Sequence, residues 1–333
     1  MPASSARVLS GHRPTGYLHL GHLVGALSNW IELQERFDCF YAIVDWHALT
    51  TNYRDPSRVK DYIRQTVIDW LAAGLDPEKC TIFVQSHVKE HAEMHLLLSM
   101  IVPLPWLERV PTYKEQQQQL ADRDINTYGF LGYPVLQAAD IVLYEARYVP
   151  VGEDQLPHLE LTREMVRRFN GLYGNVLVEP EAKTTAVSRL PGTDGRKMSK
   201  SYDNAINLSD TPEEIRAKYK TMMTDPARVR RQDPGNPDIC PVFQHHRAFT
   251  PEQRRMEIDR DCRTAAIGCV DCKADVAGRV VERFAVFRQR KAELLASPGR
   301  VEQVLSRGAE RARSVASRTI SKARQAMGLS DGN

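Results

Sequence analysis

The first hundred residues alternate between short apolar segments and longer segments with helical spacing, and this alternation constrains the fold more than any other feature. Strands are predicted at 7–10, 39–44 and 81–85, and helices at 23–36, 59–73 and 91–101. Strand–helix–strand alternation is typical of a parallel sheet with helices on both faces. We therefore expect an α/β fold with a doubly wound parallel sheet, and ligands at the carboxyl ends of its strands.

The strand pattern stops near residue 208, where an all-helical region is expected to begin. A helix start is predicted at 210–214, where a capping residue, a proline and early acids follow one another. Most of the remaining chain has a helical pattern, apart from a proline- and glycine-containing break at 233–237. We expect three segments: the α/β domain at 1–207, a smaller helical domain at 208–312, and a C-terminal helix at 313–333 that packs back on the first domain.

The composition is that of an ordinary globular protein and argues against a membrane-spanning one. Hydrophobic residues make up 42% and charged residues 26% of the 333 residues, and no apolar run approaches the roughly 20 residues needed to cross a bilayer. The beginning of the chain lacks the apolar core of a signal peptide, so we expect a cytosolic protein with reduced thiols. The net charge of +3 does not by itself indicate a nucleic-acid partner, although 228–231 forms a basic cluster.

Two histidines flank a glycine where the first predicted strand passes into the first helix. His19, Gly21 and His22 stand at a helix N-terminus, where free N–H groups and the helix dipole favour a phosphate. The imidazoles can donate hydrogen bonds to phosphate oxygens as charge builds there, and Gly21 leaves room for a flat base. A pair of capping histidines is the alternative, because a four-residue match also arises by chance.

A basic motif follows a glycine-containing loop much later in the chain. Lys197, Met198, Ser199 and Lys200 come directly after the loop 191–196. Two ammonium groups three residues apart can both reach a leaving pyrophosphate and stabilise its charge without covalent chemistry. A solvated basic loop is the alternative, which the presence of the histidine motif disfavours.

The two motifs, HLGH and KMSKS, resemble the two signature motifs of class I aminoacyl-tRNA synthetases. Longer stretches, among them SGHRPTGYLHLGHLVGAL, VPVGEDQLPHLELTREMVRRFN and GAERARSVASRTISKARQAMGL, are similar to the tryptophanyl-tRNA synthetases over nearly the whole chain. The resemblance implies a Rossmann-like catalytic domain, a helical anticodon-binding domain and a homodimer. It also implies ligation of L-tryptophan to tRNA(Trp), driven by ATP with Mg²⁺.

Three other functions are open at this point. A tyrosyl-tRNA synthetase shares the fold, but the stretches VGEDQ and LERVPTYKE argue against it. Other nucleotidyltransferases with an HxGH motif, such as cofactor adenylyltransferases, lack the long helical domain. A non-catalytic RNA-binding metalloprotein derived from a synthetase is disfavoured because both motifs are intact.

The resemblance also indicates how the amino acid is recognised. An indole carries one N–H donor on a large apolar body, so a selective pocket needs one buried acceptor among apolar walls. Asp140 matches the family's indole-reading aspartate, with a structural cap or ion pair as the alternative. Helical spacing places Tyr133, Gln137 and Asp140 on one face.

Further site residues are implied by position in the family's motifs. Val149 and Val151 are expected to line the indole, and Gln155 is expected to hold the substrate amine together with Tyr133. His47 either approaches the substrate or is structural. The ATP site is expected to include Gly11, Arg13, Gly21, Asp154, Lys197, Met198, Ser199 and Lys200. Asp154 would bind the ribose, and the Arg13 guanidinium is suited to a carboxylate.

Four of the six cysteines are grouped late in the chain. Cys240, Cys262, Cys269 and Cys272 include a CxxC pair that can chelate one metal centre, whereas Cys39 and Cys80 lie in or beside apolar strands. In a reducing compartment, four clustered thiols suggest zinc or an iron–sulfur cluster. The resemblance favours a [4Fe-4S] cluster, because some family members carry cysteines at nearly this spacing. Zinc and free thiols are the alternatives.

Overall fold

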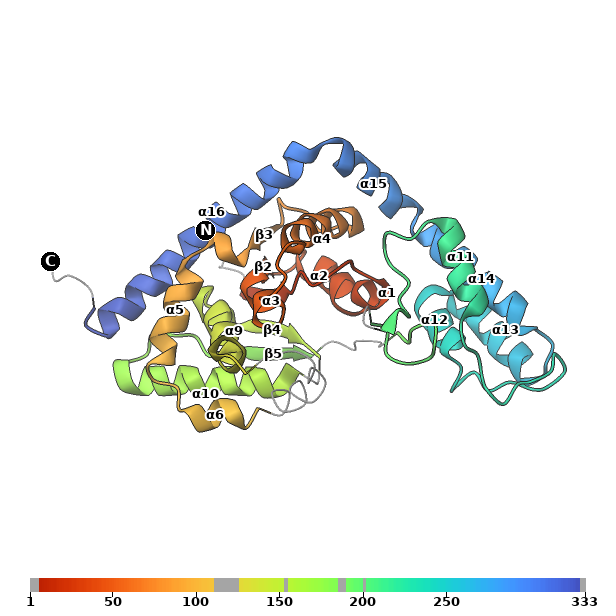
Figure 1. Ribbon diagram of the computed structural model, residues 1–333, viewed down its shortest axis with the longest axis horizontal. Helices are drawn as coiled ribbons and strands as arrows, with labels where there is room; N and C mark the ends of the chain where they lie inside the picture. The colour runs from red at the N-terminus through yellow and green to blue at the C-terminus, as the bar shows by residue number, and fades with distance from the viewer. Residues whose placement is uncertain (1–5, 111–125, 153–154, 185–189, 200–201, 330–333) are drawn as a thin grey trace.

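The computed structural model describes residues 6–110, 126–152, 155–184, 190–199 and 202–329. An α/β domain lies at one end of the molecule, and a group of shorter helices lies at the other (Figure 1). Two C-terminal helices, α15 (Ala285–Ala296) and α16 (Pro298–Ala326), run along one side and connect the two ends. Among the helices of the described ranges, none is both long and apolar enough to span a membrane.

Within the described residues, the sheet contains five parallel strands in the order β3-β2-β1-β4-β5. The chain therefore begins at the centre of the sheet and winds outward in both directions, which confirms the doubly wound α/β fold. Cys39 and Tyr41 face one side of the sheet, while Phe40 and Ala42 face the other, so that a core forms on each face. The strands are β1 (Arg7–His12), β2 (Asp38–Ile43), β3 (Cys80–Val84), β4 (Tyr148–Val151) and β5 (Glu181–Thr184).

The edge strand β5 is not indicated by the sequence pattern. Its residues EAKT contain no apolar run, and Glu181 and Ala182 are exposed. Pairing with β4, where Tyr148 lies opposite Glu181, creates the strand. This is a case in which a tertiary contact, rather than local sequence, decides the conformation.

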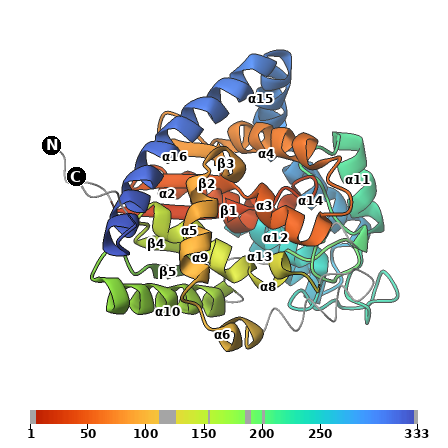
Figure 2. The same ribbon diagram turned by 60° about the vertical axis from the view of Figure 1, so that its left-hand side comes forward.

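Helices cover both faces of the sheet, as the fold requires. Trp30 and Trp70 pack on one face, and Met94 and Ile141 pack on the other. On this second face α5 and α9 lie side by side (Figure 2). The helices of the domain are α1 (Leu20–His22), a π-helical turn (Leu23–Leu27), α2 (Ser28–Leu33), α3 (Asp45–Asn52), α4 (Val59–Ala73), the 3₁₀ turn η2 (Gln85–His87), α5 (Glu90–Ser99), α6 (Leu104–Glu108), α8 (Tyr128–Leu131), α9 (Tyr133–Leu143) and α10 (Leu156–Tyr173).

The second domain is helical, as expected from the loss of strand pattern. Its first helix begins with a capping box: Thr211 accepts a hydrogen bond from the Glu214 N–H, and Glu214 accepts one from the Thr211 N–H. Tyr219 and Val280 are fully buried in its core. Its helices are α11 (Pro212–Thr221), α12 (Pro241–Phe249), α13 (Glu252–Arg263) and α14 (Cys269–Arg283), followed by α15.

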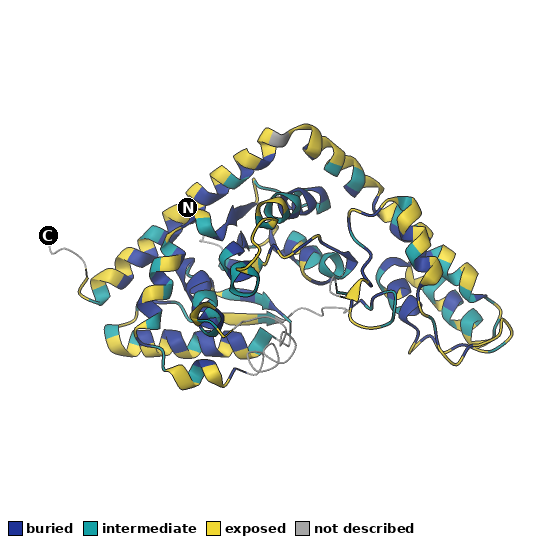
Figure 3. Ribbon diagram, in the orientation of Figure 1, coloured by how far each residue is buried: buried dark blue, intermediate teal, exposed yellow. Residues whose placement is uncertain are grey.

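The last helix is longer than the segment expected from residue 313. It begins at Pro298, a favoured residue for a first helical position, and runs unbroken to Ala326. Near its end, the Thr319 hydroxyl donates a 2.8 Å hydrogen bond to the Leu143 carbonyl of α9. The helix is buried on its inner side and exposed on its outer side (Figure 3).

α16 crosses the sheet edge at β3 from one face to the other. Val304 belongs to the core on one face and Ala312 to the core on the opposite face. Between them, Gly308 lies directly against the backbone of Ile82, and a Cβ at Gly308 would overlap the Ile82 carbonyl. The helix therefore covers the backbone of an edge strand that would otherwise be open to pairing.

The preceding helix, α15, attaches to the α/β domain through a buried ion pair. The ammonium nitrogen of Lys291 lies 2.8 Å from Asp69 Oδ1 on α4, and the Asp69 side chain is only 2% exposed. Because a lone buried carboxylate is costly, this pair strongly favours the observed docking of α15.

We expect Gly308→Ala to destabilise the protein although alanine is the better helix former. Overlap with the Ile82 carbonyl should outweigh the helix-propensity gain of about 1 kcal/mol and leave a net loss of about 1–3 kcal/mol. The midpoint of urea unfolding measures the change. Gly278→Ala in α14, where a Cβ meets open space, is the matched control and should raise the midpoint; equal behaviour of the two variants would contradict the close contact.

Candidate active site

A cavity of about 380 Å³ opens where β1 and β4 end, as expected for a doubly wound sheet. Its walls include Trp30, Phe130 and Ile141, so that much of the lining is apolar. The structure brings together there nine of the residues that the sequence predicts for the amino acid and ATP sites: Gly11, Arg13, His47, Tyr133, Gln137, Asp140, Val149, Val151 and Gln155.

Local structure explains why these side chains meet. Tyr133, Gln137 and Asp140 lie on α9 at helical spacing and present one face to the cavity. Val149 and Val151 alternate along β4, so both point to the same side of the sheet and both are buried. The cavity thus has polar groups on its α9 wall and apolar side chains on its β4 wall.

Asp140 is the buried polar centre of the cavity, with only 4% of its surface exposed. Its Oδ1 accepts hydrogen bonds from Gln85 Nε2 at 2.7 Å and from His91 Nδ1 at 2.6 Å. Its Oδ2 accepts one from His47 Nε2 at 2.9 Å. A carboxylate oxygen accepts about two hydrogen bonds, so Oδ1 is saturated by these groups while Oδ2 has capacity for a further donor.

The neighbours of Asp140 also keep it ionised. Burial raises the pKa of its carboxyl group, but the charge of His91 and the hydrogen bonds from His47 and His91 lower it more. The net result is a pKa well below the usual range, so the group is a carboxylate at neutral pH. Structural contacts of Asp140, which the sequence left open as an alternative, are therefore present, and Oδ2 still has capacity for a donor in the cavity.

The histidine motif lies at the start of α1. The rings of His19 and His22 lie 3.7 Å apart between centroids, and His22 Nδ1 accepts a 3.2 Å hydrogen bond from the His19 backbone N–H. His22 thus caps the helix start, as the alternative interpretation had it. A Cβ at Gly21 would lie 3.0 Å from the His19 ring, so only glycine fits there without a shift.

The lysine motif lies beside the histidine motif. Met198 is buried, and its Cβ is 3.9 Å from the position that a Cβ on Gly21 would take. The main chain just beyond the motif bonds to the strand-like segment before α1, with Leu20 N–H donating to the Ile206 carbonyl at 2.9 Å. The structure therefore brings Lys197, Met198 and Ser199 to the HLGH segment, whereas Lys200 and Asp154 lie outside the described residues.

The four late cysteines lie around the N-termini of two helices. Cys240 caps α12, and Cys269 and Cys272 occupy the first turn of α14. Burial raises the pKa of the Cys272 thiol to about 12, and Cys240, Cys262 and Cys269 add to the rise, which shows that the four thiols are neighbours. Within the described ranges, however, no three ligating side chains stand close enough to hold an ion as they are.

Polar groups lie close to two of these thiols. Helix N-termini stabilise thiolates, and the Arg228 guanidinium lies 3.8 Å from Cys262 Sγ. His246 Nε2 lies 3.3 Å from Cys272 Sγ. Four cysteines are a donor set of the kind that binds zinc or an iron–sulfur cluster.

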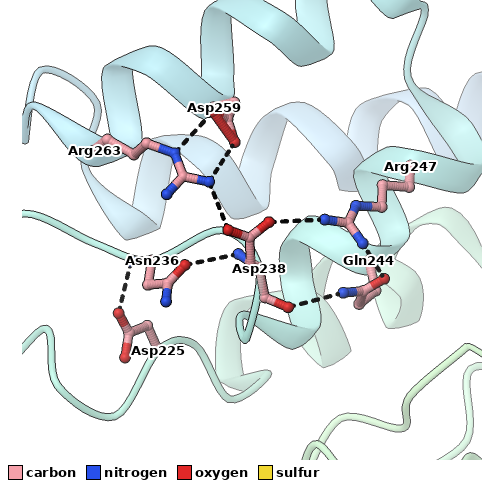
Figure 4. Close-up of polar contacts among 7 residues, drawn as sticks. All are labelled: Asp225, Asn236, Asp238, Gln244, Arg247, Asp259 and Arg263. Atoms are coloured by element: carbon pink, nitrogen blue, oxygen red, sulfur yellow. Dashed lines mark hydrogen bonds and ion pairs between the residues drawn. The ribbon is translucent and has the colours of Figure 1, made fainter.

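Ion pairs hold together the segments that carry Cys240 and Cys262 (Figure 4). Asp238 pairs with Arg247 of α12 at 3.1 Å and with Arg263 of α13 at 2.8 Å. Asn236 accepts the Asp238 N–H at 3.0 Å and donates its own N–H to Asp225 at 2.8 Å. The loop before Cys240 is therefore bonded to both neighbouring helices.

The fold and the two motifs together define a class of enzyme. Residues 1–285 match the family model described as tRNA synthetases class I (W and Y), the tryptophan and tyrosine enzymes. The chain therefore belongs to this family of class I aminoacyl-tRNA synthetases.

Relatives of the chain narrow the family to its tryptophan members. The tryptophan–tRNA ligase of Thermotoga maritima is 55% identical over 325 residues, covering 97% of this chain and 99% of the relative. That of Deinococcus radiodurans is 41% identical over 329 residues, with the same coverage of 97% and 99%. The crystal structure of Campylobacter jejuni tryptophanyl-tRNA synthetase with ADP and tryptophan has a TM-score of 0.87 and 32% identity, covering 97% of this chain and 100% of that one. The chain groups with the tryptophan–tRNA ligases.

Three residues of the site are not indicated by the sequence motifs. Gln85 lies just after β3, at the ligand end of a predicted strand, so its position was a usable signal. His91 lies inside α5 and is fully buried, and no local pattern marks it. Asn204 is 2% exposed and bonds to the lysine-motif loop, a contact that only the folded loop reveals.

We expect Asp140→Asn to weaken tryptophan binding at least about tenfold, because an amide replaces the buried carboxylate acceptor. It should also lower stability at pH 7, because it removes the charged partner of His47 and His91. A carboxyl group with a lowered folded-state pKa stabilises above its unfolded pKa of about 3.9 and loses this effect as pH falls, so the stability difference should narrow below pH 4.

Equilibrium titration with tryptophan and urea unfolding at several pH values measure both effects. Asp45→Asn is the matched control, since this buried carboxyl accepts the Ser86 N–H at 3.0 Å and does not line the cavity. A variant at Asp140 that binds tryptophan like the wild type would rule out the acceptor role.

Proposed function

We propose that, in the cytosol, the chain ligates L-tryptophan to tRNA(Trp) in two steps, using ATP with Mg²⁺. The observation that carries the proposal is a largely apolar cavity with one buried, ionised acceptor, Asp140. Its lining residue His12 packs against His22 of the HLGH motif, whose Gly21 lies beside Met198 of the lysine motif. The cavity supplies a site for an indole. The paired motifs supply groups suited to a nucleotide's phosphates.

In the first step the tryptophan carboxylate attacks the α-phosphorus of ATP, the bond to the β-phosphate breaks, and pyrophosphate leaves. His19 and His22 donate hydrogen bonds to the α-phosphate at the helix start. Lys197 and Lys200 bind the departing pyrophosphate, whose growing charge they stabilise. Gly11, Arg13, Gly21, Met198 and Ser199 complete the nucleotide site, and Asp154 binds the ribose.

The cavity selects tryptophan by one hydrogen bond among apolar contacts. The indole N–H donates to Asp140 Oδ2, the oxygen that the protein leaves with capacity for a donor. Val149 and Val151 contact the ring, while Gln137 and His47 border it. Gln155 and Tyr133 bind the α-amine. A phenylalanine ring has no such donor and would leave the buried carboxylate with an unused acceptor site.

In the second step the ribose hydroxyl at the 3′ end of the tRNA attacks the carbonyl carbon of the adenylate, and AMP leaves. The helical domain contacts the anticodon. We also propose a homodimer: Leu96 on α5 and Met100, the C-cap of that helix, are one turn apart and are 52% and 67% exposed. An apolar face of this kind fits a second copy of the chain, and Leu96→Lys should then lower the mass measured by sedimentation.

We propose that Cys240, Cys262, Cys269 and Cys272 hold a [4Fe-4S] cluster, with zinc as the alternative occupant of the same thiols. Support comes from their mutual proximity, the two helix N-termini and the nearby Arg228. When bound, the cluster would link the starts of α12 and α14 to the end of α13. It would thus stabilise the helical domain without taking part in adenylate formation.

Tryptophan-dependent exchange of pyrophosphate with ATP should be measurable, and tyrosine should not support it. Lys197→Ala should reduce exchange on the order of 100-fold or more, as the loss of one stabilising charge does in comparable sites. Lys79→Ala, which removes a surface lysine paired with Glu35, is the control and should change nothing. Absence of exchange with tryptophan in the wild type would refute the proposed function.

Protein purified without oxygen should contain about four irons and four acid-labile sulfides per chain and show a visible charge-transfer spectrum. Cys272→Ser should lose the metal, whereas Cys80→Ser, which alters a buried cysteine of β3, should keep it. Finding one zinc per chain instead would show that the four thiols hold a structural zinc ion and not a cluster. Four titratable thiols without metal would contradict the site altogether.

A further inference from the structure

We propose that Asn204 is a positioning residue for adenylate formation. It holds the lysine-motif loop in the conformation in which the Lys197 ammonium group can contact the pyrophosphate. The inference rests on the proposed role of Lys197 in that loop. Asn204 does not contact the cavity and lies three residues beyond the KMSKS motif. Its side chain acts through the main chain of Lys197 and Ser199.

The loop is wrapped around the Asn204 side chain. Asn204 Oδ1 accepts the Ser199 backbone N–H at 2.8 Å, while Nδ2 donates to the Lys197 carbonyl at 3.1 Å and to Asp194 Oδ1 at 2.7 Å. Its own carbonyl accepts the Thr193 N–H at 2.9 Å. One buried amide thus holds the main chain on both sides of Met198.

Glycine at position 192 makes this close approach possible. A Cβ at Gly192 would overlap the Asn204 amide and lie 2.7 Å from the Asn204 carbonyl oxygen. The loop can therefore close on Asn204 only without a side chain at this position. The Gly192 main chain and the Asn204 side chain therefore pack directly against each other.

An asparagine suits this position better than its near isostere. Two of its contacts need a donor and one needs an acceptor, which is the inventory of a primary amide. Aspartate has the same shape but two acceptor oxygens, so one would face the Lys197 carbonyl and the Asp194 carboxylate. This repulsion would open the loop with little change in volume.

The loop forms hydrogen bonds with both domains, so its geometry is tied to the position of each. On one side, His245 Nε2 donates to the Pro191 carbonyl at 2.9 Å and Met223 N–H donates to the Thr193 carbonyl at 2.7 Å. Burial lowers the pKa of His245 to about 4, so its ring is neutral and Nδ1 accepts the Tyr219 hydroxyl at 2.7 Å.

On the other side, the chain after Asn204 bonds to the segment around α1 through Leu20 and Ile206. Asn204 therefore lies between two bonded segments. The loop at 191–193 is bonded to the helical domain, and the chain at 206 is bonded to the catalytic domain. Loss of Asn204 should move Lys197 relative to His19 without disturbing the tryptophan cavity.

The test measures pyrophosphate exchange and tryptophan binding separately for Asn204→Asp. We expect kcat for exchange to fall on the order of 100-fold, the typical effect of a small displacement of a reacting group. The Kd for tryptophan without ATP should stay within about twofold, because the cavity is untouched. Gly192→Ala, which pushes on the same amide from the opposite side, should give the same split.

Asn170→Asp is the matched control for a purely structural effect. Asn170 is another amide that bonds several main-chain groups, donating to the Leu177 carbonyl and accepting the N–H groups of Val176 and Leu177, but it lies on α10 away from the motifs. It should lower the thermal midpoint with kcat unchanged.

Each remaining outcome decides the question. Exchange close to wild type in a folded Asn204→Asp or Gly192→Ala variant would overturn the positioning role, and if Asn204→Asp does not fold, Gly192→Ala alone decides. A loss of tryptophan affinity equal to the loss of kcat would also overturn it. If Lys197→Ala retains full exchange, the proposed function of the loop fails instead, so the two failures are distinguishable.

Discussion

The site depends on a short main-chain bridge between segments far apart in sequence. Leu20 N–H bonds to the Ile206 carbonyl, and Leu208 N–H bonds to the Leu18 carbonyl. These two hydrogen bonds place the chain after the lysine motif beside the histidine motif. The two motifs are otherwise far apart in the sequence. With these hydrogen bonds, the groups that we propose to bind the phosphates of ATP lie on neighbouring segments.

The electrostatics of the cavity around Asp140 follow from the cost of burying a charge. Asp140 is almost fully enclosed, and an isolated carboxylate there would become protonated and lose its acceptor strength. Gln85, His47 and His91 prevent this by donating three hydrogen bonds. These three donors occupy most of the acceptor capacity of Asp140. Its Oδ2 atom can accept one further hydrogen bond.

Much of the fold could be predicted from sequence, because β2 and β3 are largely apolar runs and α4 has regular helical spacing. The cavity residues were found through motif resemblance, and local periodicity correctly grouped Tyr133, Gln137 and Asp140. Contacts that depend on distant segments could not be found in this way. β5 has no pattern of its own, His91 is an unremarkable helix residue, and Asn204 matters only because the loop closes on it.

The path of α16 has a consequence for the order in which the chain can fold. This helix fills part of the core on both faces of the sheet and covers the backbone of β3, yet it is synthesised after all the described strands. A nascent chain that already contains all five strands still lacks this cover, and its edge strand remains open to pairing with other chains. The α/β domain precedes the helical domain in the chain, but it can be completed only after the helical domain has been made.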